Sequence, residues 1–140
     1  MKRNASAHWD GGLKDGKGTL TAPSGVLKGT PYSFATRFGE TPGTNPEELI
    51  AAAHAGCFTM ALSNALGVAG FPPAKLDTTA TVTLDKVADG FGITTVHLDV
   101  KADVPRIEDK KFQAVAADAK ANCPVSKVLN AKITMEARLV

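Results

Sequence analysis

The sequence predicts an α+β fold, in which a central helix and a second helix pack with largely antiparallel β-sheet. Three observations predict it. A long apolar segment opens with residues typical of a helix start, two runs of alternating polarity flank an Asp-Gly pair, and no βαβ unit repeats along the chain. The chain has 140 residues, of which 44% are hydrophobic and 21% charged. This length and composition suit a single domain over residues 1–140, with its own hydrophobic core.

Charge and cysteine content limit the functional classes. The net charge is +2 and the basic residues are scattered, so we expect neither nucleic acid nor a membrane as a partner. The 2 cysteines are too few for a disulfide scaffold. The basic residues 1–6 lead into no apolar run, so we expect no signal peptide and a cytoplasmic protein. In that compartment thiols stay reduced unless their own chemistry oxidises them.

The first part of the chain carries short strand-like segments separated by glycine turn signals. Gly-Gly and Asp-Gly pairs separate the first two segments, and the third alternates in polarity. The expected strands are residues 5–10, 18–22 and 32–38. In the third, Tyr32, Phe34, Thr36 and Phe38 share one face and Arg37 points to the other. A turn-rich connector follows.

Residues 45–70 predict a buried central helix. Asn45 suits the N-cap and Pro46 suits the first helical position, while Glu47 and Glu48 place negative charge at the positive end of the helix dipole. Glu48 also stands where a capping-box carboxylate belongs. Beyond it the segment is apolar all round, which predicts burial on every face. It is too short and too rich in alanine for a convincing membrane span, so we expect it to form the core.

The rest of the chain predicts a hairpin, a second helix and a final strand. Two alternating runs joined through Asp89-Gly90 are a strong hairpin signal. Apolar residues at helical spacing predict the second helix, and Pro124 can begin a short helix after it. The expected elements are strands at 76–85 and 95–100, helices over 108–121 and 124–130, and a strand over 133–139.

Two cysteines carry the question of function. Cys57 lies in the middle of the central helix, where it is either a small buried hydrophobe or a functional thiol. Cys123 directly precedes Pro124 at an expected helix N-terminus, a position that favours a thiolate and suggests a working pair. The two are separated by 65 residues, which excludes a CxxC motif, so only the fold can bring them together.

Other candidate residues have adequate structural explanations. His54, one turn before Cys57, could act as a base or as a metal ligand, but a hydrogen-bonded core or interface histidine is the favoured interpretation. We expect no metal site, because no fourth ligand accompanies His54 and the cysteines. Glu47 and Glu48 can be first-turn carboxylates only, and Arg37 a surface residue with a buried stem.

Three motifs resemble the osmotically inducible protein C (OsmC) family, the sister of the organic hydroperoxide resistance (Ohr) proteins. They are TNPEELI at 44–50, AHAGCF at 53–58 and CPVS at 123–126, and the likeness extends over essentially the whole chain. The 32–38 segment favours the OsmC branch. Gly56 differs from the alanine expected there. A glycine inside a helix costs about 1 kcal/mol, and here it would let another backbone or a substrate approach the thiol closely.

The resemblance implies a reaction and roles for individual residues. The OsmC-like fold would be an intertwined homodimer that reduces organic hydroperoxides, and hydrogen peroxide more weakly, without cofactor or metal. Cys57 would be the peroxidatic cysteine and Cys123 the resolving cysteine, forming an intramolecular disulfide. Arg37 would pair with Glu47 and hold the thiolate and the peroxide oxygen. A dithiol, either a lipoylated protein, thioredoxin or a small thiol, would reduce the disulfide.

Helix geometry adds an expectation about the dimer. Glu47 and Cys57 are ten residues apart, about 15 Å along a helix, so Glu47 cannot reach the thiol of its own helix. Antiparallel packing of two such helices would bring Glu47 of one subunit near Cys57 of the other. Candidate walls of an apolar substrate pocket are Phe38, Leu49, Ile50, Phe58 and Met60.

Two other classes of function compete with the peroxidase. A non-enzymatic redox sensor or small-ligand-binding module could use the same cysteine switch and would be oxidised once without turnover. A dimeric scaffold with inert thiols would not react with hydroperoxide at all.

Overall fold

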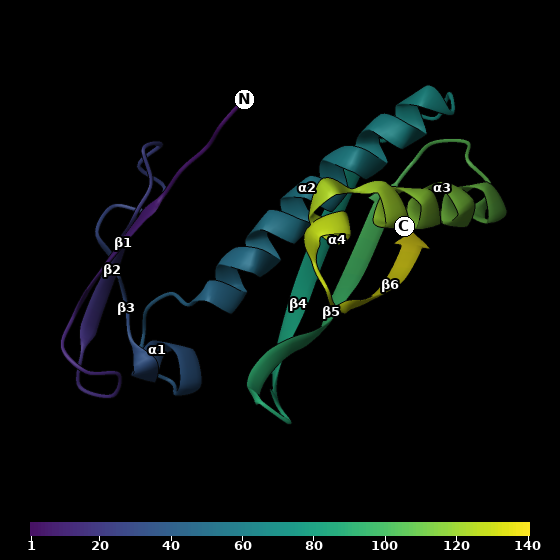
Figure 1. The fold of residues 1–140 in the computed structure, drawn as a ribbon. Coiled ribbons are helices and arrows are strands. Elements are labelled where there is room, and N and C mark those ends of the chain that lie inside the picture. The colour runs from purple at the N-terminus through teal and green to yellow at the C-terminus, as the bar shows by residue number, and fades with distance from the viewer. The chain divides into compact units, whose positions relative to one another are not determined.

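The computed structural model describes residues 1–140 and contains two compact units, Met1–Leu49 and Ile50–Val140. Ten elements follow one another along the chain, six strands and four helices (Figure 1). Helices and two separate three-stranded sheets coexist, which confirms the predicted α+β class. The expectation of a single domain over residues 1–140 stays a prediction.

A small antiparallel sheet forms the first unit. Its strands are β1 (Ser6–Asp10), β2 (Lys17–Thr21) and β3 (Thr30–Tyr32), in the order β1-β2-β3. The rings of Trp9 and Tyr32 lie on one face with their centroids 5.4 Å apart. Gly18 lies beneath both rings, and a Cβ at this position would collide with them. The first two predicted strands are thus confirmed, and a glycine allows the aromatic pair to close over the sheet.

The prediction of a strand over residues 32–38 is wrong beyond its first residue. Tyr32 ends β3, and the short helix α1 covers Phe34–Phe38. Ser33 and Thr36 form a reciprocal capping box. The Thr36 N–H donates to Ser33 Oγ at 3.2 Å, and the Ser33 N–H donates to Thr36 Oγ1 at 2.8 Å. These local hydrogen bonds start a helix where the alternation of apolar residues indicated a strand.

The central helix α2 (Pro46–Val68) begins and ends as predicted. Asn45 caps it, because its Oδ1 accepts the backbone N–H of Glu48 at 2.8 Å. The Glu48 carboxylate accepts the Thr44 hydroxyl at 2.8 Å instead of closing a capping box. At the other end Gly70 adopts a φ of +89°, and the N–H of Phe71 donates to the carbonyl of Leu66 at 2.9 Å. This is the Schellman geometry that a glycine permits.

The prediction that α2 is buried on every face is wrong for the protomer. The buried side chains form one stripe at a spacing of four residues: His54, Phe58, Leu62 and Leu66. On the opposite side Met60 is 76% exposed and Val68 is 82% exposed. By length and composition α2 could also cross a membrane, but its buried stripe packs into the core of the second unit. The protomer alone therefore leaves an apolar face of α2 uncovered.

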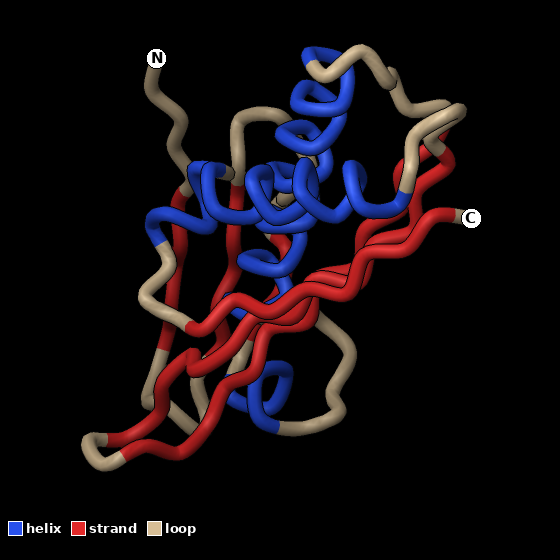
Figure 2. Tube along the Cα trace, turned by 90° about the vertical axis from the view of Figure 1, so that its right-hand side faces the viewer, coloured by secondary structure: helices blue, strands red, loops and turns tan.

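The sheet of the second unit combines the predicted hairpin with a parallel strand. β4 (Lys75–Val87) and β5 (Gly90–Asp103) pair antiparallel, and β6 (Lys132–Leu139) lies on the other side of β5 (Figure 2). β6 runs parallel to β5, so the sheet is less antiparallel than expected. The reason is the connection, since two helices separate these strands and return the chain to the same end of the sheet.

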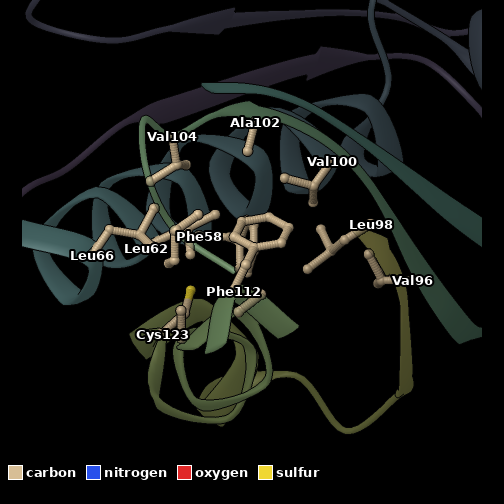
Figure 3. Packing of buried hydrophobic residues seen from close by; sticks show 13 residues of the cluster. Phe58, Leu62, Leu66, Val96, Leu98, Val100, Ala102, Val104, Phe112 and Cys123 are labelled. Carbon is tan, nitrogen blue, oxygen red and sulfur yellow. The ribbon is translucent and has the colours of Figure 1, made fainter. Parts of the chain in front are cut away.

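Helices α3 (Asp109–Asn122) and α4 (Pro124–Val128) lie between β5 and β6 in the chain, close to the predicted bounds. Apolar side chains from α2, β5 and α3 interlock in one core (Figure 3). Its fully buried members include Phe58, Leu62, Val96, Leu98, Val100, Phe112 and Cys123. The core thus surrounds one of the two cysteines.

Candidate active site

The two cysteine side chains meet in the second unit. Cys57 lies in the middle of α2, and Cys123 lies at the junction of α3 and α4. Both are free thiols, and a hydrogen bond joins their sulfur atoms, which are 2.8 Å apart. They are 66 positions apart in the chain, so the packing of α2 against α3 and α4 creates the pair. Figure 3 shows the Cys123 side chain directed from this junction into the core.

A break between two helices positions Cys123. Its N–H donates to the carbonyl of Ala119 at 3.0 Å, which ends α3, and its carbonyl accepts the N–H of Lys127 at 3.1 Å, which begins α4. Pro124 occupies the first position of α4, where its missing N–H costs nothing. Cys123 is fully buried, whereas Cys57 is half-buried. Of the two sulfurs, Cys57 is therefore the one more open to a substrate.

Burial and hydrogen bonding act differently on the two thiols. Burial raises the pKa of Cys57, and the Cys123 side chain raises it further, while the N–H of Val125 opposes both. Burial alone would also raise the pKa of Cys123. There, hydrogen bonds from the Cys57 thiol, from the N–H and hydroxyl of Ser126 and from the N–H of Val125 together lower the pKa. A negative charge on the pair is therefore more stable on Cys123 than on Cys57.

His54 contacts the site through a serine. The ring is fully buried, and Nε2 lies 2.8 Å from the Ser126 hydroxyl oxygen. The other ring nitrogen, Nδ1, is buried without a hydrogen-bond partner. Burial lowers the pKa of His54, which keeps the ring neutral near pH 7. The favoured interpretation, a hydrogen-bonded core histidine, describes this geometry, and no group of three or more His, Cys, Asp or Glu side chains is placed to hold a metal ion.

Arg37 and Glu47 form an ion pair within the first unit. Arg37 Nη2 donates to Glu47 Oε1 at 2.7 Å, and Arg37 Nε lies 3.2 and 3.3 Å from the two carboxylate oxygens. The Glu47 side chain is only 11% exposed, and the Arg37 guanidinium also lies over the ring of Phe38 at 5.4 Å. The fork of two or more N–H donors fixes the orientation of the guanidinium. The pair is present, and its role in catalysis stays a prediction.

The predicted pocket residues lie in different surroundings. Phe38 and Arg37 line a cavity of about 80 Å³ in the first unit, together with Trp9, Leu13, Tyr32, Ser33, Phe34 and Pro46. Leu49 and Ile50 are half-buried, Met60 is exposed, and Phe58 belongs to the core, where it has no exposed surface. Trp9, Tyr32 and Phe34 were not among the pocket residues predicted from the sequence. Tyr32 and Phe34 carry a sequence signal, because they are aromatic residues within a few positions of Arg37 and Phe38 in a chain with only 6% aromatic residues, whereas Trp9 reaches the cavity only through the pairing of the strands.

Comparison with known proteins decides the family. Residues 39–138 match the family described as OsmC-like protein. The chain is also 54% identical over 139 residues to the Escherichia coli K12 protein named Peroxiredoxin OsmC, covering 99% of this chain and 97% of that protein. The chain belongs to the OsmC-like protein family. An organic hydroperoxide resistance protein of Xanthomonas axonopodis pv. citri is 28% identical over 105 residues, which are 74% of this chain and 70% of that protein.

Solved structures of OsmC-like proteins share the fold. The organic hydroperoxide resistance protein OhrB of Bacillus subtilis superposes with a TM-score of 0.74 at 27% identity, covering 96% of this chain and 98% of that one. An OsmC-like protein of unknown function from Vibrio cholerae superposes with a TM-score of 0.78 at 15% identity, covering 99% of both chains, and this second likeness concerns the fold alone. Both the family and the α+β fold predicted from the sequence are confirmed.

Within this OsmC-like fold, the arrangement suits sulfur chemistry. A half-buried thiol lies in contact with a second thiol that can trap an oxidised form of the first. Ser126 was also given no role from the sequence, although it stands inside the CPVS motif. Its spacing of three residues after a cysteine at a helix start was the available signal, because such a residue falls in the first turn of the helix.

Proposed function

We propose that this OsmC-like protein is a thiol-dependent peroxidase that reduces organic hydroperoxides, and hydrogen peroxide more weakly, to an alcohol or water. The observation that carries the proposal is the contact of 2.8 Å between the sulfurs of Cys57 and Cys123. Two free thiols in contact can store both electrons that one hydroperoxide requires. The names of two relatives, Peroxiredoxin OsmC and organic hydroperoxide resistance protein, support the same reaction.

The reaction has two steps on sulfur. The Cys57 thiolate attacks the outer oxygen of the hydroperoxide, so that an S–O bond forms, the O–O bond breaks and the alkoxide leaves as an alcohol after taking a proton. The Cys123 thiolate then attacks the sulfur of the Cys57 sulfenic acid. The S–S bond forms, the S–O bond breaks, and the hydroxide takes a proton and leaves as water. A thiol reductant restores both cysteines by disulfide exchange.

Arg37 and Glu47 supply the charge that the first step needs. Burial raises the pKa of Cys57, so the thiolate requires a nearby cation. A guanidinium stays protonated, and it can stabilise both the thiolate and the negative charge that develops on the leaving oxygen. Glu47, nearly buried, holds the guanidinium by its fork of hydrogen bonds. We propose this electrostatic role for the pair.

The active form is a homodimer in which α2 lies at the interface. The exposed face of α2 carries Met60 and Val68, and covering such a surface favours association. A Cβ added at Gly56 or Gly67 would meet nothing within 4 Å in the protomer. These glycines have no packing reason inside one chain, which fits close approach by a second copy. Light scattering coupled to size exclusion should give the mass of two chains, and the mass of one chain would exclude the dimer.

The dimer proposal includes a shared site, with Arg37 and Glu47 of one subunit serving Cys57 of the other. A mixing experiment tests it. Glu47→Ala and Cys57→Ser chains are unfolded together and refolded. Random association should restore about a quarter of wild-type activity, because half of the dimers are mixed and each of these has one intact site. Mixing Glu47→Ala with the Glu47→Ala/Cys57→Ser double variant is the control, because it holds as many Cys57 thiols without any Glu47 and should show only the residual activity of Glu47→Ala. Recovery no greater than in this control contradicts sharing.

One stopped-flow experiment separates the peroxidase from its alternatives. Reduced protein is mixed with cumene hydroperoxide, and thiol loss is followed with and without dithiothreitol. Continued turnover with reductant supports the enzyme. A single oxidation without turnover supports a redox sensor or ligand-binding module, and no reaction supports a scaffold.

We propose that the protein works in the cytoplasm, where thiols stay reduced. We propose also that a dithiol reduces its disulfide. Lipoylated protein, thioredoxin and a small thiol are the three candidate classes, since each can exchange with a protein disulfide. Comparing the rates at which reduced thioredoxin, dihydrolipoamide and, as the small thiol, dithiothreitol reduce the oxidised protein ranks them. The class with the largest rate constant is assigned as the reductant.

A further inference from the structure

Two pairs of side chains, one pair from each of two helices, meet at the sulfur site. On α2, His54 lies one turn before Cys57, and on α4, Ser126 lies one turn after Cys123. Each side chain of the α2 pair contacts one side chain of the α4 pair. Sulfur lies 2.8 Å from sulfur, and His54 Nε2 lies 2.8 Å from the Ser126 hydroxyl oxygen. The mechanism above uses the sulfurs and gives the ring and the hydroxyl no role.

The surroundings of His54 determine which nitrogen carries hydrogen. The ring is neutral, so one nitrogen is a donor and the other an acceptor. Nδ1 is buried and has no partner. An orphaned buried N–H is rare in proteins, so the hydrogen belongs on the other nitrogen, Nε2, which has the Ser126 hydroxyl as its partner.

The Ser126 hydroxyl then has a defined direction. Its oxygen accepts from His54 Nε2–H, which leaves its single proton free for another acceptor. The Cys123 sulfur is the acceptor that fits, since Cys123 is the N-cap of α4 and Ser126 is the third residue of that helix, and a hydroxyl donating to this sulfur would stabilise the thiolate. The chain of hydrogen bonds inferred in this way runs from His54 through Ser126 to Cys123, whose sulfur lies 2.8 Å from that of Cys57.

We propose that His54 and Ser126 are positioning residues for the resolving cysteine, with His54 holding the Ser126 hydroxyl so that its proton is directed at the Cys123 sulfur. The inference rests on the proposed function. Cys123 must attack the Cys57 sulfenic acid as a thiolate, and it must leave as a thiolate when a reductant attacks the Cys57 side of the disulfide. One donor serves both steps, since the same charge on the same atom is stabilised in each.

The first measurement isolates Cys123. In a Cys57→Ser background Cys123 is the only thiol. Its ionisation is followed as a function of pH by iodoacetamide alkylation with mass spectrometry and, because the sulfur is buried, also by the ultraviolet absorbance of the thiolate, which needs no access for a reagent. Adding Ser126→Ala should slow alkylation at pH 7 about tenfold, the usual effect of losing a hydrogen bond to a charged group, while the plateau at high pH stays unchanged. Ser126→Thr keeps the hydroxyl and should restore the rate.

The second measurement tests whether His54 acts through Ser126. His54→Leu should shift the alkylation profile in the same direction as Ser126→Ala, and His54→Gln, which keeps an N–H donor, should restore most of the rate. The double variant His54→Leu/Ser126→Ala should be no slower than Ser126→Ala alone, because the ring has nothing left to position. A purely structural role of His54 would give additive effects instead.

A third measurement uses the chain with both cysteines. Equilibration in dithiothreitol redox buffers, at a pH above the pKa of Cys123 in both proteins, should show the disulfide of Ser126→Ala about tenfold harder to reduce than that of the wild type, since the reduced form loses a stabilised thiolate.

The chain offers a matched control for these variants. His97 on β5 lies 2.7 Å from the hydroxyl of Thr134 on β6, a second histidine–hydroxyl pair in the same unit. His97→Leu and Thr134→Val should leave the alkylation profile and the redox equilibrium of the cysteines unchanged.

Several outcomes overturn the proposal. An alkylation profile of Ser126→Ala that coincides with its Cys57→Ser parent excludes the serine, and full additivity with His54→Leu excludes the relay. Should circular dichroism show that the His54 variants do not fold, the comparison of Ser126→Ala with Ser126→Thr decides alone. Failure of the proposed function is distinguishable, because the wild type would then not turn over hydroperoxide while the alkylation differences persist.

Discussion

The two compact units of the chain carry different parts of the proposed chemistry. Residues 1–49 hold the ion pair of Arg37 and Glu47, in which fixed charges are oriented by a fork of hydrogen bonds. Residues 50–140 hold both sulfurs, placed where burial raises the pKa of Cys57. The unit of residues 50–140 supplies the nucleophile, and the unit of residues 1–49 supplies the cation that we propose for the first step.

This division separates two tasks that conflict in one environment. A sulfur protected from over-oxidation is best placed in a packed core, beside a second sulfur that traps its oxidised form. A guanidinium held by a carboxylate is best kept near the surface, where desolvation of the charges costs less. The variants below test the division by removing one contribution at a time, and they are ordered by expected effect.

Removing the nucleophile should have the largest effect. Cys57→Ser should abolish hydroperoxide reduction, a loss of at least about a thousandfold in kcat/KM, because a neutral hydroxyl does not replace a thiolate. Cys123→Ser should spare the first oxidation, seen as one burst of thiol loss in stopped flow, and impair recycling. A normal burst in Cys57→Ser would transfer the peroxidatic role to Cys123.

Removing the cation should have the next largest effect. Arg37→Met should lower kcat/KM for cumene hydroperoxide about 100-fold to 1000-fold, as loss of a charge-stabilising donor does elsewhere. Because burial raises the pKa of Cys57, the pH profile of Cys57 alkylation should also move to higher pH in this variant. Arg138, which pairs with Asp99 at 3.0 Å and is 40% exposed against 38% for Arg37, is the matched control. A loss in Arg138→Met equal to that in Arg37→Met would refute a specific role for Arg37.

Releasing the orientation of the cation should have a smaller effect. Glu47→Gln keeps the shape of the side chain and removes its charge, so the guanidinium stays but its fork is weakened. We expect about a tenfold loss in kcat/KM, from loss of one charge-assisted hydrogen-bonded pair. Glu48→Gln is the control, since Glu48 is the next residue and its carboxylate bonds the Thr44 hydroxyl. Equal losses of kcat/KM in the two variants would mean that the negative charge at the start of α2, and not the contact with Arg37, affects the reaction.

The smallest effect concerns stability in acid and involves the sulfur unit alone. Burial lowers the pKa of His54 below its ordinary value of 6.5, so the unfolded chain binds a proton that the folded chain does not. The free energy of unfolding should therefore fall as pH drops below 6.5, by at most about 1.4 kcal/mol per pH unit from this residue. Urea unfolding between pH 5 and 7 measures it. His54→Gln should remove this slope and His97→Gln should keep it, and an unchanged slope in His54→Gln contradicts the assignment.

Much of the fold could be predicted from the sequence, because many of its causes are local. The start of α2 follows from Asn45 and Pro46, the hairpin follows from an Asp-Gly pair between alternating runs, and Pro124 begins α4. The prediction of a strand over residues 32–38 is wrong, although the signal for the helix that forms there is local too. Ser33 and Thr36 form a capping box that competes with the alternation.

The candidate site was only partly accessible to sequence reasoning. The motifs name Cys57 and Cys123, and the spacing of residues on a helix places Glu47 away from the thiol of its own helix. Ser126 received no role, because its contact with His54 joins residues 72 positions apart. The face of α2 that packs into the core was equally hidden, since a helix that is apolar all round carries no periodic signal to select one face.

By itself the sequence determined the local elements, the family motifs and the two thiols on which the chemistry depends. Only the tertiary structure decided that the two sulfurs meet, that one stripe of α2 is buried, and that β6 runs parallel to β5. The physical reason is the range of the forces involved. Caps, turns and periodicity act between residues a few positions apart, whereas contact between distant segments depends on how whole faces pack together.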